Sequence, residues 1–119
     1  YGLLGHLLEM CLGGKVSAEI YFKNIPFING IEKLAKSNII PGGTKKNLTY
    51  VKPYLYSDDI ITTNEKLMLA DAQTSGGLLI AVNESDCEIL IERINSNNDI
   101  SAKCIGIIKD KQTKSIYIK

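Results

Sequence analysis

The sequence predicts one α/β (α+β) domain in which helices cover a mixed β-sheet. Predicted helices and predicted strands alternate along the chain. The helices are recognised by apolar residues at spacings of three and four, and the strands by short apolar or alternating segments, as in a sheet packed against helices. Of the 119 residues, 45% are hydrophobic and 23% are charged, which are ordinary values for a globular protein. The glycine- and proline-containing stretches are short enough to be turns, so residues 1–119 are expected to form a single domain.

The first predicted elements are a helix over residues 3–12 and a strand over residues 16–22. Apolar residues recur in the helix at spacings of three and four. Gly13-Gly14 is the predicted C-cap, because glycine adopts a positive φ without a steric penalty. The strand alternates, with these residues expected on one face: Val16, Ala18, Ile20 and Phe22.

The middle of the chain carries weaker signals. A short amphipathic helix is predicted across residues 30–38, and Pro41-Gly42-Gly43-Thr44 indicates a loop. Residues 45–57 show no clean period, so we expect irregular structure with at most a helical turn. A further helix, capped by Thr63 or Asn64, is predicted to run to about residue 70.

The last part of the chain reads as strand, helix, strand, strand. The apolar run 78–82 follows a polar, glycine-rich stretch and is typical of a strand buried on both faces. A helix is expected to start at Asn83 or Ser85, and strands are expected at 102–109 and 114–118, joined by a hairpin turn at residues 110–113. The stretch 78–109 would then form a right-handed crossover unit if its two strands are parallel.

Composition excludes several classes of function. The formal net charge is +1 and the basic residues are scattered, so we expect no nucleic-acid partner. No apolar run approaches the roughly 18 residues that a membrane span needs, so we expect no membrane partner. Cys11, Cys87 and Cys104 are odd in number and widely spaced, which predicts buried thiols that act as small hydrophobes and a reducing, cytoplasmic location. His6 cannot complete a zinc site with them, and no metal site is predicted.

Three segments combine glycine with polar residues at the edge of a predicted element. Glycine allows close approach of a ligand or of another chain, and a helix start attracts anions such as phosphate. The candidate residues for a substrate or phosphate cleft are Gly2, Gly5, His6, Thr44, Asn47, Gln73, Thr74, Ser75, Gly76 and Gly77.

Taken singly, each segment also has a plainer structural interpretation. None is a P-loop or a dinucleotide fingerprint. Gly42-Gly43 and Gly76-Gly77 can be tight turns or caps, and His6 can be a packed or partly exposed side chain of the first helix. No nucleophile can be paired with His6, so no catalytic residue is predicted.

Together the three segments resemble the selenophosphate synthetase (selenide, water dikinase) family. Tyr1-Gly2-Leu3-Leu4-Gly5-His6-Leu7 with Glu9-Met10 resembles its GFGLLGHL-x-EM element. Pro41-Gly42-Gly43-Thr44 with Asn47 resembles PGGT-x-x-N, and the stretch 71–79 resembles DPQTSGGLL, in the same order and spacing. Tyr1 stands in place of phenylalanine and Ala72 in place of proline, and both are mild departures.

The resemblance implies the C-terminal domain of a larger, two-domain enzyme of the aminoimidazole ribonucleotide synthetase-like type. Such enzymes use ATP and Mg²⁺ to turn selenide and water into selenophosphate, orthophosphate and AMP. The nucleophile and most metal ligands of the family lie in the N-terminal half. We therefore expect this chain to begin inside a longer protein, to bind neither cofactor and to be inactive alone. Its partners would be its own N-terminal domain and, for the full-length enzyme, a second copy in a homodimer.

Two alternatives stay open at this point. Another ATP-dependent enzyme of the same superfamily would share the fold, for example an aminoimidazole ribonucleotide synthetase, a thiamine monophosphate kinase or a hydrogenase-maturation enzyme. A non-catalytic binding module is also compatible with a chain that shows no complete site.

Overall fold

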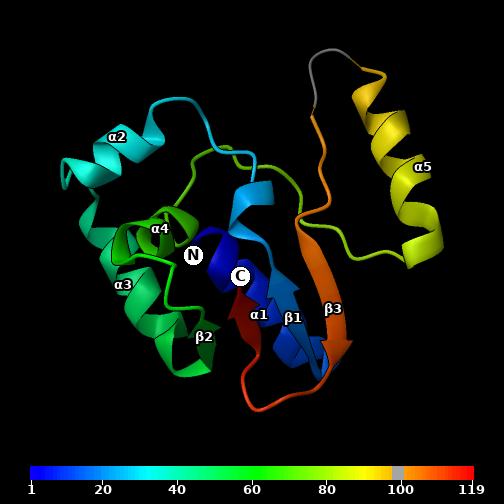
Figure 1. Ribbon diagram of the computed structural model, residues 1–119, viewed down its shortest axis with the longest axis horizontal. Coiled ribbons are helices and arrows are strands. Elements are labelled where there is room, and N and C mark those ends of the chain that lie inside the picture. Colours follow the sequence, from blue (N-terminus) through cyan, green and yellow to red (C-terminus); the bar gives the residue numbers. More distant parts are fainter. Residues whose placement is uncertain (98–100) are drawn as a thin grey trace.

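The computed structural model describes residues 1–97 and 101–119, and it confirms the predicted α/β class. A four-stranded mixed sheet has the order β2-β4-β1-β3 (Figure 1). β1 pairs antiparallel with β3 and parallel with β4, which in turn pairs parallel with β2. The strands are β1 (Val16–Ile20), β2 (Leu55–Ser57), β3 (Gly106–Asp110) and β4 (Ile116–Ile118).

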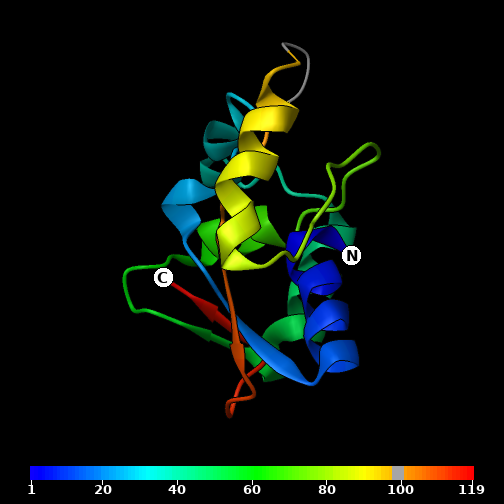
Figure 2. The same ribbon diagram turned by 90° about the vertical axis from the view of Figure 1, so that its right-hand side faces the viewer.

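Five α-helices are present in the described part of the chain: α1 (Gly2–Gly14), α2 (Ile31–Lys36), α3 (Gly42–Val51), α4 (Thr63–Leu69) and α5 (Glu84–Asn95). α1 packs against β1 and β4 and also against α3 and α4. α5 stands apart from these four helices, beyond the edge strand β3 (Figures 1 and 2). None of the described helices is both long and apolar enough to cross a membrane.

The hydrophobic core lies between α1 and the centre of the sheet. Leu4, Leu8 and Cys11 recur at spacings of four and three on one face of α1 and are completely buried. The sheet contributes Ala18 and Ile20 of β1 with the isoleucines of β4, which are aligned side by side by the strand register. The burial of Cys11 confirms the small-hydrophobe interpretation for this cysteine, and burial raises the pKa of its thiol.

The opposite face of the sheet is polar and partly open to solvent. The rings of Tyr56 and Tyr117 pack in a tilted arrangement with their centroids 5.6 Å apart. Next to them, Lys109 of β3 donates to Glu19 of β1 at 2.9 Å, and Tyr21 donates to the same carboxylate at 3.0 Å. This hydrogen bond from Lys109 is the main reason why the pKa of Glu19 is held below its ordinary value of 4.5.

The lowered pKa of Glu19 predicts an acid-sensitive contribution to stability. Because the folded state prefers the ionised carboxylate, the contribution is fully present above pH 4.5 and is lost as the pH falls through the lowered folded pKa. We expect the urea midpoint of the chain to fall more steeply with pH in that acidic window than the midpoint of Glu19→Gln. Parallel pH profiles of the two proteins would contradict the prediction.

The predicted helices at 3–12, 30–38 and 63–70 are confirmed, although two of their caps differ. α1 ends at Gly14, and the left-handed cap residue is Lys15 with φ 53° rather than a glycine. α4 is capped by Thr62, whose hydroxyl accepts from the backbone N–H of Glu65 while the Glu65 carboxylate accepts from the Thr62 backbone N–H. This reciprocal capping box fixes the helix start one residue before the first predicted cap.

The expectation of irregular structure over residues 45–57 is wrong. α3 begins directly at the glycine pair after Pro41, and β2 follows it after one 3₁₀ turn. The buried or half-buried positions of α3 are Thr44, Asn47, Leu48 and Val51, which form a stripe at helical spacing. Two of these four residues are polar, so the apolar periodicity of the segment is weak.

The expectation of a doubly buried strand at residues 78–82 is also wrong. The segment is unpaired in the structure, and the side chains of Leu78 and Ile80 are 91% and 51% exposed. Leu79 alone packs partly against the core. The crossover unit 78–109 is therefore not formed, although its helix α5 is present from Glu84, with Asn83 as the N-cap residue.

The predicted hairpin between the last two strands does not form. β3 and β4 occur close to where they were expected, but each pairs with β1, on opposite sides of it. The connection is held by Ser17 of β1, whose hydroxyl donates to the Lys114 carbonyl at 2.7 Å and accepts from the Gln112 backbone N–H at 2.9 Å. The turn therefore crosses the end of β1 instead of reversing beside it.

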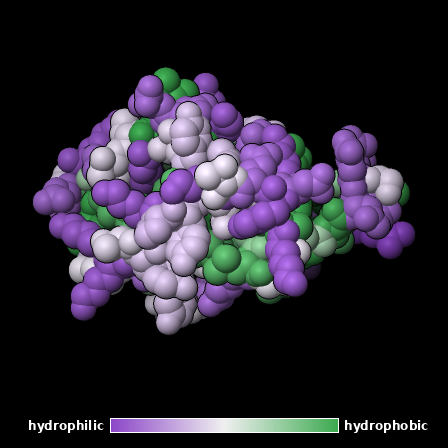
Figure 3. Space-filling model, turned by 90° about the horizontal axis from the view of Figure 1, so that it is seen from below, coloured by the Kyte–Doolittle hydropathy of each residue, from purple (hydrophilic) through white to green (hydrophobic). Residues whose placement is uncertain are grey.

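This topology leaves apolar side chains uncovered around β3. Ile107 and Ile108 are 45% and 46% exposed, although Ile108 lies beside the buried Ala18 in the sheet register. As neighbours in a strand, the two side chains point to opposite faces of the sheet. Leu78, Ile80 and Val82 of the segment before α5 are exposed as well, and we call these five exposed residues the β3-side apolar surface. Seen from below, hydrophobic surface runs through the right half of the molecule toward its projecting end (Figure 3).

Candidate functional site

The three glycine-containing segments meet at one place, which we call the motif junction. Gly2 opens α1 with φ +68°, and a Cβ atom there would lie 2.5 Å from the carbonyl carbon of Ala70 and 2.8 Å from the carbonyl oxygen of Asp71. Only glycine fits this close approach of two backbones at a positive φ. The first segment is therefore packed directly on the start of the third.

The second segment is tied to the same place by two side chains of α3. The Thr44 hydroxyl, 1% exposed, donates to Oδ1 of Asp71. One turn further along, Nδ2 of Asn47 donates to the carbonyl oxygen of Ala70 at 3.0 Å. The two side chains lie on the same face of α3, so the helix clamps both residues at the end of α4.

Tyr1 covers the outer side of the junction. Its ring lies 6.3 Å from the His6 ring in an edge-on arrangement and 6.4 Å from the ring of Tyr50. A Cβ atom on Gly5 would lie 2.5 Å from the Cβ atom of Tyr1, so the glycine makes room for this aromatic side chain. Gly5 thus serves packing at this position.

His6 and the rest of the third segment lie on the exposed rim. His6 is exposed, with Nδ1 3.4 Å from the Glu9 carboxylate, which agrees with the plainer interpretation as a partly exposed helix residue. Gln73, Thr74, Ser75, Gly76 and Gly77 are all exposed and form the loop near the N-terminal end of the chain in Figure 2. The structure therefore brings Gly2, Gly5, Thr44 and Asn47 together and places the other six candidates around them.

Two members of the junction were not among the predicted site residues. The Asp71 carboxylate and the Ala70 carbonyl hold α3 in place, and each accepts a hydrogen bond from a predicted site residue. The position of Asp71 at the head of the third segment was an available signal. A backbone carbonyl such as that of Ala70 leaves no trace in a sequence, because every residue carries one.

We expect Thr44→Val to destabilise the chain by about 1 to 2 kcal/mol, because it removes a hydroxyl whose partner carboxylate is only partly solvated. The valine keeps the volume, so the loss reports the hydrogen bond. Chemical denaturation of the chain measures it, and Thr49→Val is a matched control, because the Thr49 hydroxyl bonds within its own exposed helix turn. An equal effect of the two substitutions would argue against the Thr44–Asp71 bond.

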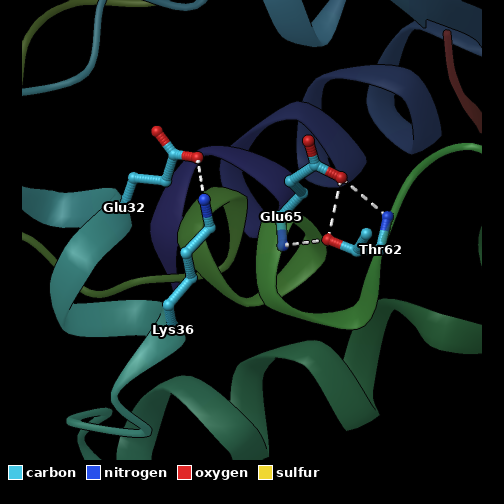
Figure 4. A network of polar contacts seen from close by, with 4 residues as sticks. All are labelled: Glu32, Lys36, Thr62 and Glu65. Carbon is cyan, nitrogen blue, oxygen red and sulfur yellow. Dashed lines mark hydrogen bonds and ion pairs between the residues drawn. The ribbon is translucent and has the colours of Figure 1, made fainter.

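The hollows of the surface lie elsewhere. Two hollows of about 270 Å³ each open between α2 and α4 and share Glu32, Glu65 and Met68 in their walls. Figure 4 shows the polar groups on this side, where Lys36 pairs with Glu32 at 2.7 Å and Thr62 forms the capping box with Glu65. These carboxylates are engaged in helix contacts, and no residue of the motif junction lines either hollow.

Clusters of metal-ligating side chains are absent from the described part of the chain. Within residues 1–97 and 101–119, no three His, Cys, Asp or Glu side chains lie close enough together to hold a metal ion. The start of α3 offers a different chemistry. Nothing lies within 4 Å of where a Cβ atom on Gly42 or Gly43 would be, so this helix start is open and its backbone N–H groups can approach phosphate oxygens.

Comparison with known proteins gives one consistent result over the whole chain. The chain is 43% identical over 116 residues to a selenide, water dikinase of Carboxydothermus hydrogenoformans, covering 98% of this chain and 33% of that protein. It is 42% identical over 118 residues to the selenide, water dikinase of Clostridioides difficile, covering 99% of this chain and 34% of that protein. The corresponding protein of Campylobacter jejuni is 40% identical over 118 residues.

The chain spans about one third of the length of these relatives. The profile of the family described as AIR synthase related protein, C-terminal domain, matches residues 1–119. The match includes the motif junction and agrees with the mixed sheet and its helices. The chain therefore belongs to the AIR synthase related family, as its C-terminal domain, and its relatives in that family are selenide, water dikinases.

Proposed function

We propose that this chain is the C-terminal part of an enzyme that makes selenophosphate, AMP and orthophosphate from ATP, selenide and water. The observation that carries the proposal is the motif junction, at which three segments far apart in the sequence meet through Gly2, Thr44 and Asn47. The relatives that match 98–99% of this chain are named selenide, water dikinases, which supports the proposal.

In the proposed enzyme, this chain forms one wall of the active-site cleft. Phosphoryl transfer needs metal ions bridging the phosphates, together with fixed donors around the developing charge. The described residues do not form a metal site, so we assign metal binding and the nucleophile to the remaining two thirds of the protein. The exposed loop at Gln73–Gly77 and the open start of α3 are the edges that would face ATP.

The proposed partner is the N-terminal domain of the same protein. The exposed residues of the β3-side apolar surface support this, because a domain interface would remove such side chains from water. The chain alone is proposed to be inactive. The homodimer stays a prediction from the resemblance, and the cytoplasmic location stays a prediction from the cysteines of the chain.

The test is a phosphorus NMR time course with ATP, Mg²⁺ and selenide, on the full-length protein and on residues 1–119 in parallel. We expect a selenophosphate signal and matching AMP from the full-length protein only. Thr74→Ala and Asn47→Ala in the full-length protein are each expected to lower kcat/KM by roughly tenfold or more. The first substitution removes one positioned donor, and the second releases the Ala70 carbonyl that Asn47 holds next to the third segment. Unchanged kinetics in both variants would contradict the proposal that these edges face the active-site cleft.

The product distribution also distinguishes the proposed dikinase from the alternative, a sister enzyme of the same family. ATP consumption that does not need selenide, or ADP as the only nucleotide product, would overturn the dikinase assignment and favour a sister enzyme of the family. Selenophosphate formed by residues 1–119 alone would instead overturn the proposal that this chain lacks the chemistry.

A further inference from the structure

A hollow beside the start of α2 combines apolar walls with two carboxylates. We call it the loop-side hollow, because residues 27–31 form one of its walls, and its volume is about 270 Å³. Met68 of α4, which is 8% exposed, is the most deeply buried residue of the lining. Phe22 and Phe27 also line the hollow, and their ring centroids lie 5.2 Å apart. Small-molecule pockets span roughly 300 to 1,000 Å³, so this volume suits one small ligand.

Three parts of the chain build the loop-side hollow. Phe22 opens a 3₁₀ turn, Phe22–Asn24, shortly after β1. Gly30 is the N-cap residue of α2 and has a φ of +93°, a conformation that suits glycine and turns the chain from the loop into the helix. α2 then packs against α4, whose start is fixed by the capping box of Thr62. Backbone geometry and helix packing therefore hold the walls of the hollow in place.

The two charged residues of this lining, Glu32 and Glu65, are both acidic. Lys36 lines only the neighbouring hollow, where its ammonium group donates to Oε1 of Glu32 at 2.7 Å. Oε2 of Glu65 accepts both the backbone N–H and the hydroxyl of Thr62, at 2.7 and 2.8 Å. The second oxygen of each carboxylate lies outside these contacts (Figure 4). The loop-side hollow thus has acceptors to offer and lacks a cation of its own.

These groups select the class of ligand. An anion such as phosphate would meet two like charges, which disfavours it. A metal ion would need more ligands, since no three metal-ligating side chains lie together within residues 1–97 and 101–119. An organic ammonium ion carries three donors for carboxylate oxygens, and its apolar body can cover Met68 and the phenylalanine rings.

We propose that the loop-side hollow binds a small primary amine with an apolar body. The apolar body lies against Met68 and the rings of Phe22 and Phe27, and the ammonium group donates to the second oxygens of Glu32 and Glu65. No residue of the motif junction lines this hollow. α2 and α4 lie on the opposite side of the molecule from β3 and α5 (Figure 1). A partner on the β3-side apolar surface therefore leaves the hollow open to a free small molecule.

The test is methionine methyl NMR of the full-length protein, titrated at neutral pH with 2-phenylethylamine. The Met68 signal, assigned from its loss in Met68→Leu, is expected to shift saturably with a millimolar dissociation constant, as for other ligands of this size. Met10 of α1 does not line the hollow, and its signal is the internal control. 2-Phenylethanol has the same size and no charge. It is expected to bind roughly tenfold more weakly, because it lacks the charge-assisted hydrogen bonds.

The amine probe also leaves the cysteines unmodified. Cys104 is exposed and Cys87 is half-buried, so the expectation of three buried thiols is correct for Cys11 alone. A primary amine does not react with a thiol, so the shift of the Met68 signal reports binding.

Two substitutions test the carboxylates and keep the hollow. Glu65→Gln retains a side chain that can complete the capping box, and Glu32→Gln removes only an exposed ion pair with Lys36. Each is expected to weaken the binding of 2-phenylethylamine by about threefold to tenfold and to leave that of 2-phenylethanol unchanged. Glu92→Gln, at an exposed position of α5, is the matched control and should leave both affinities as they are.

The outcomes do not depend on the dikinase assignment. A saturable shift of the Met68 signal that weakens in both glutamine variants supports the proposal. No shift, equal affinities for the two probes, or an amine affinity that neither glutamine variant changes would each overturn it. Binding to residues 1–119 but not to the full-length protein would show that the remaining domain fills the hollow, and would overturn its assignment to a free small molecule.

Discussion

Gly2→Ala is expected to lower the free energy of unfolding of the chain by about 3 kcal/mol, because the new Cβ overlaps backbone atoms at a left-handed conformation. The nearest atoms are the carbonyl carbon and oxygen of Ala70, at 2.5 and 2.6 Å from the position of that Cβ. Backbone atoms cannot turn away as the end of a flexible side chain can. α1 would therefore have to shift from the end of α4, and the motif junction would open.

Gly43→Ala is the matched control for this prediction. A Cβ atom at Gly43 meets nothing within 4 Å, and the residue lies in the first turn of α3. Alanine there should be neutral or should stabilise the chain by up to about 1 kcal/mol, through its better helix propensity. Urea titrations of both variants measure the difference. Equal stabilities would show that Gly2 is not wedged between α1 and residues 70–71.

The same pair of substitutions separates stability from function in the full-length protein. Gly2→Ala is expected to lower activity by disturbing the junction as a whole, together with thermal stability. Gly43→Ala should leave stability intact, and any fall in activity would then report on access of phosphate to the open start of α3. This contrast distinguishes a glycine required for packing from one that leaves room for a ligand.

Some contacts of the motif junction could be predicted from the sequence and others could not, depending on the kind of contact. The glycine-containing segments could be recognised as a set, and the structure places all three at one junction. The side-chain donors Thr44 and Asn47 were also identified. The Ala70 acceptor was missed because a backbone carbonyl leaves no trace in a sequence, whereas Asp71 was missed although it stands at the head of the third segment.

The fold was predicted well where one periodicity dominated a segment. α1 has three fully buried residues on one face at spacings of three and four, and its limits agree with the prediction to within two residues. α3 was missed because its buried stripe includes Thr44 and its first residues are glycines. Local propensity gives no sign that such a segment becomes helical by packing against α1 and α4.

The order of the strands in the sheet could not be predicted from the sequence. A short turn between two apolar segments is the usual sign of a hairpin, and residues 110–113 have that appearance. Pairing across the end of β1 is decided by Ser17, whose hydroxyl engages the turn at both Lys114 and Gln112. This is a contact between residues far apart in the sequence, and nothing in either segment announces it.

Leu8→Ala and Leu78→Ala are expected to differ more than any other pair of leucine substitutions considered for this chain. Leu8 is completely buried in the core, and its truncation should cost about 3 to 4 kcal/mol of unfolding free energy. Leu78 is 91% exposed, and its truncation should change stability by no more than about 0.5 kcal/mol. Leu79→Ala should give an intermediate loss, because Leu79 packs partly against the core.

The comparison is decisive for residues 78–82, because the apolar pattern of this segment predicts the opposite result. A buried strand would make Leu78→Ala as costly as Leu8→Ala, and that outcome in residues 1–119 would contradict the arrangement described above. In the full-length protein, the cost of Leu78→Ala is expected to rise toward about 2 kcal/mol if the remaining domain covers the β3-side apolar surface. The same cost in both proteins would leave that surface without the proposed partner, because burial at a domain interface must stabilise the side chains that it removes from water.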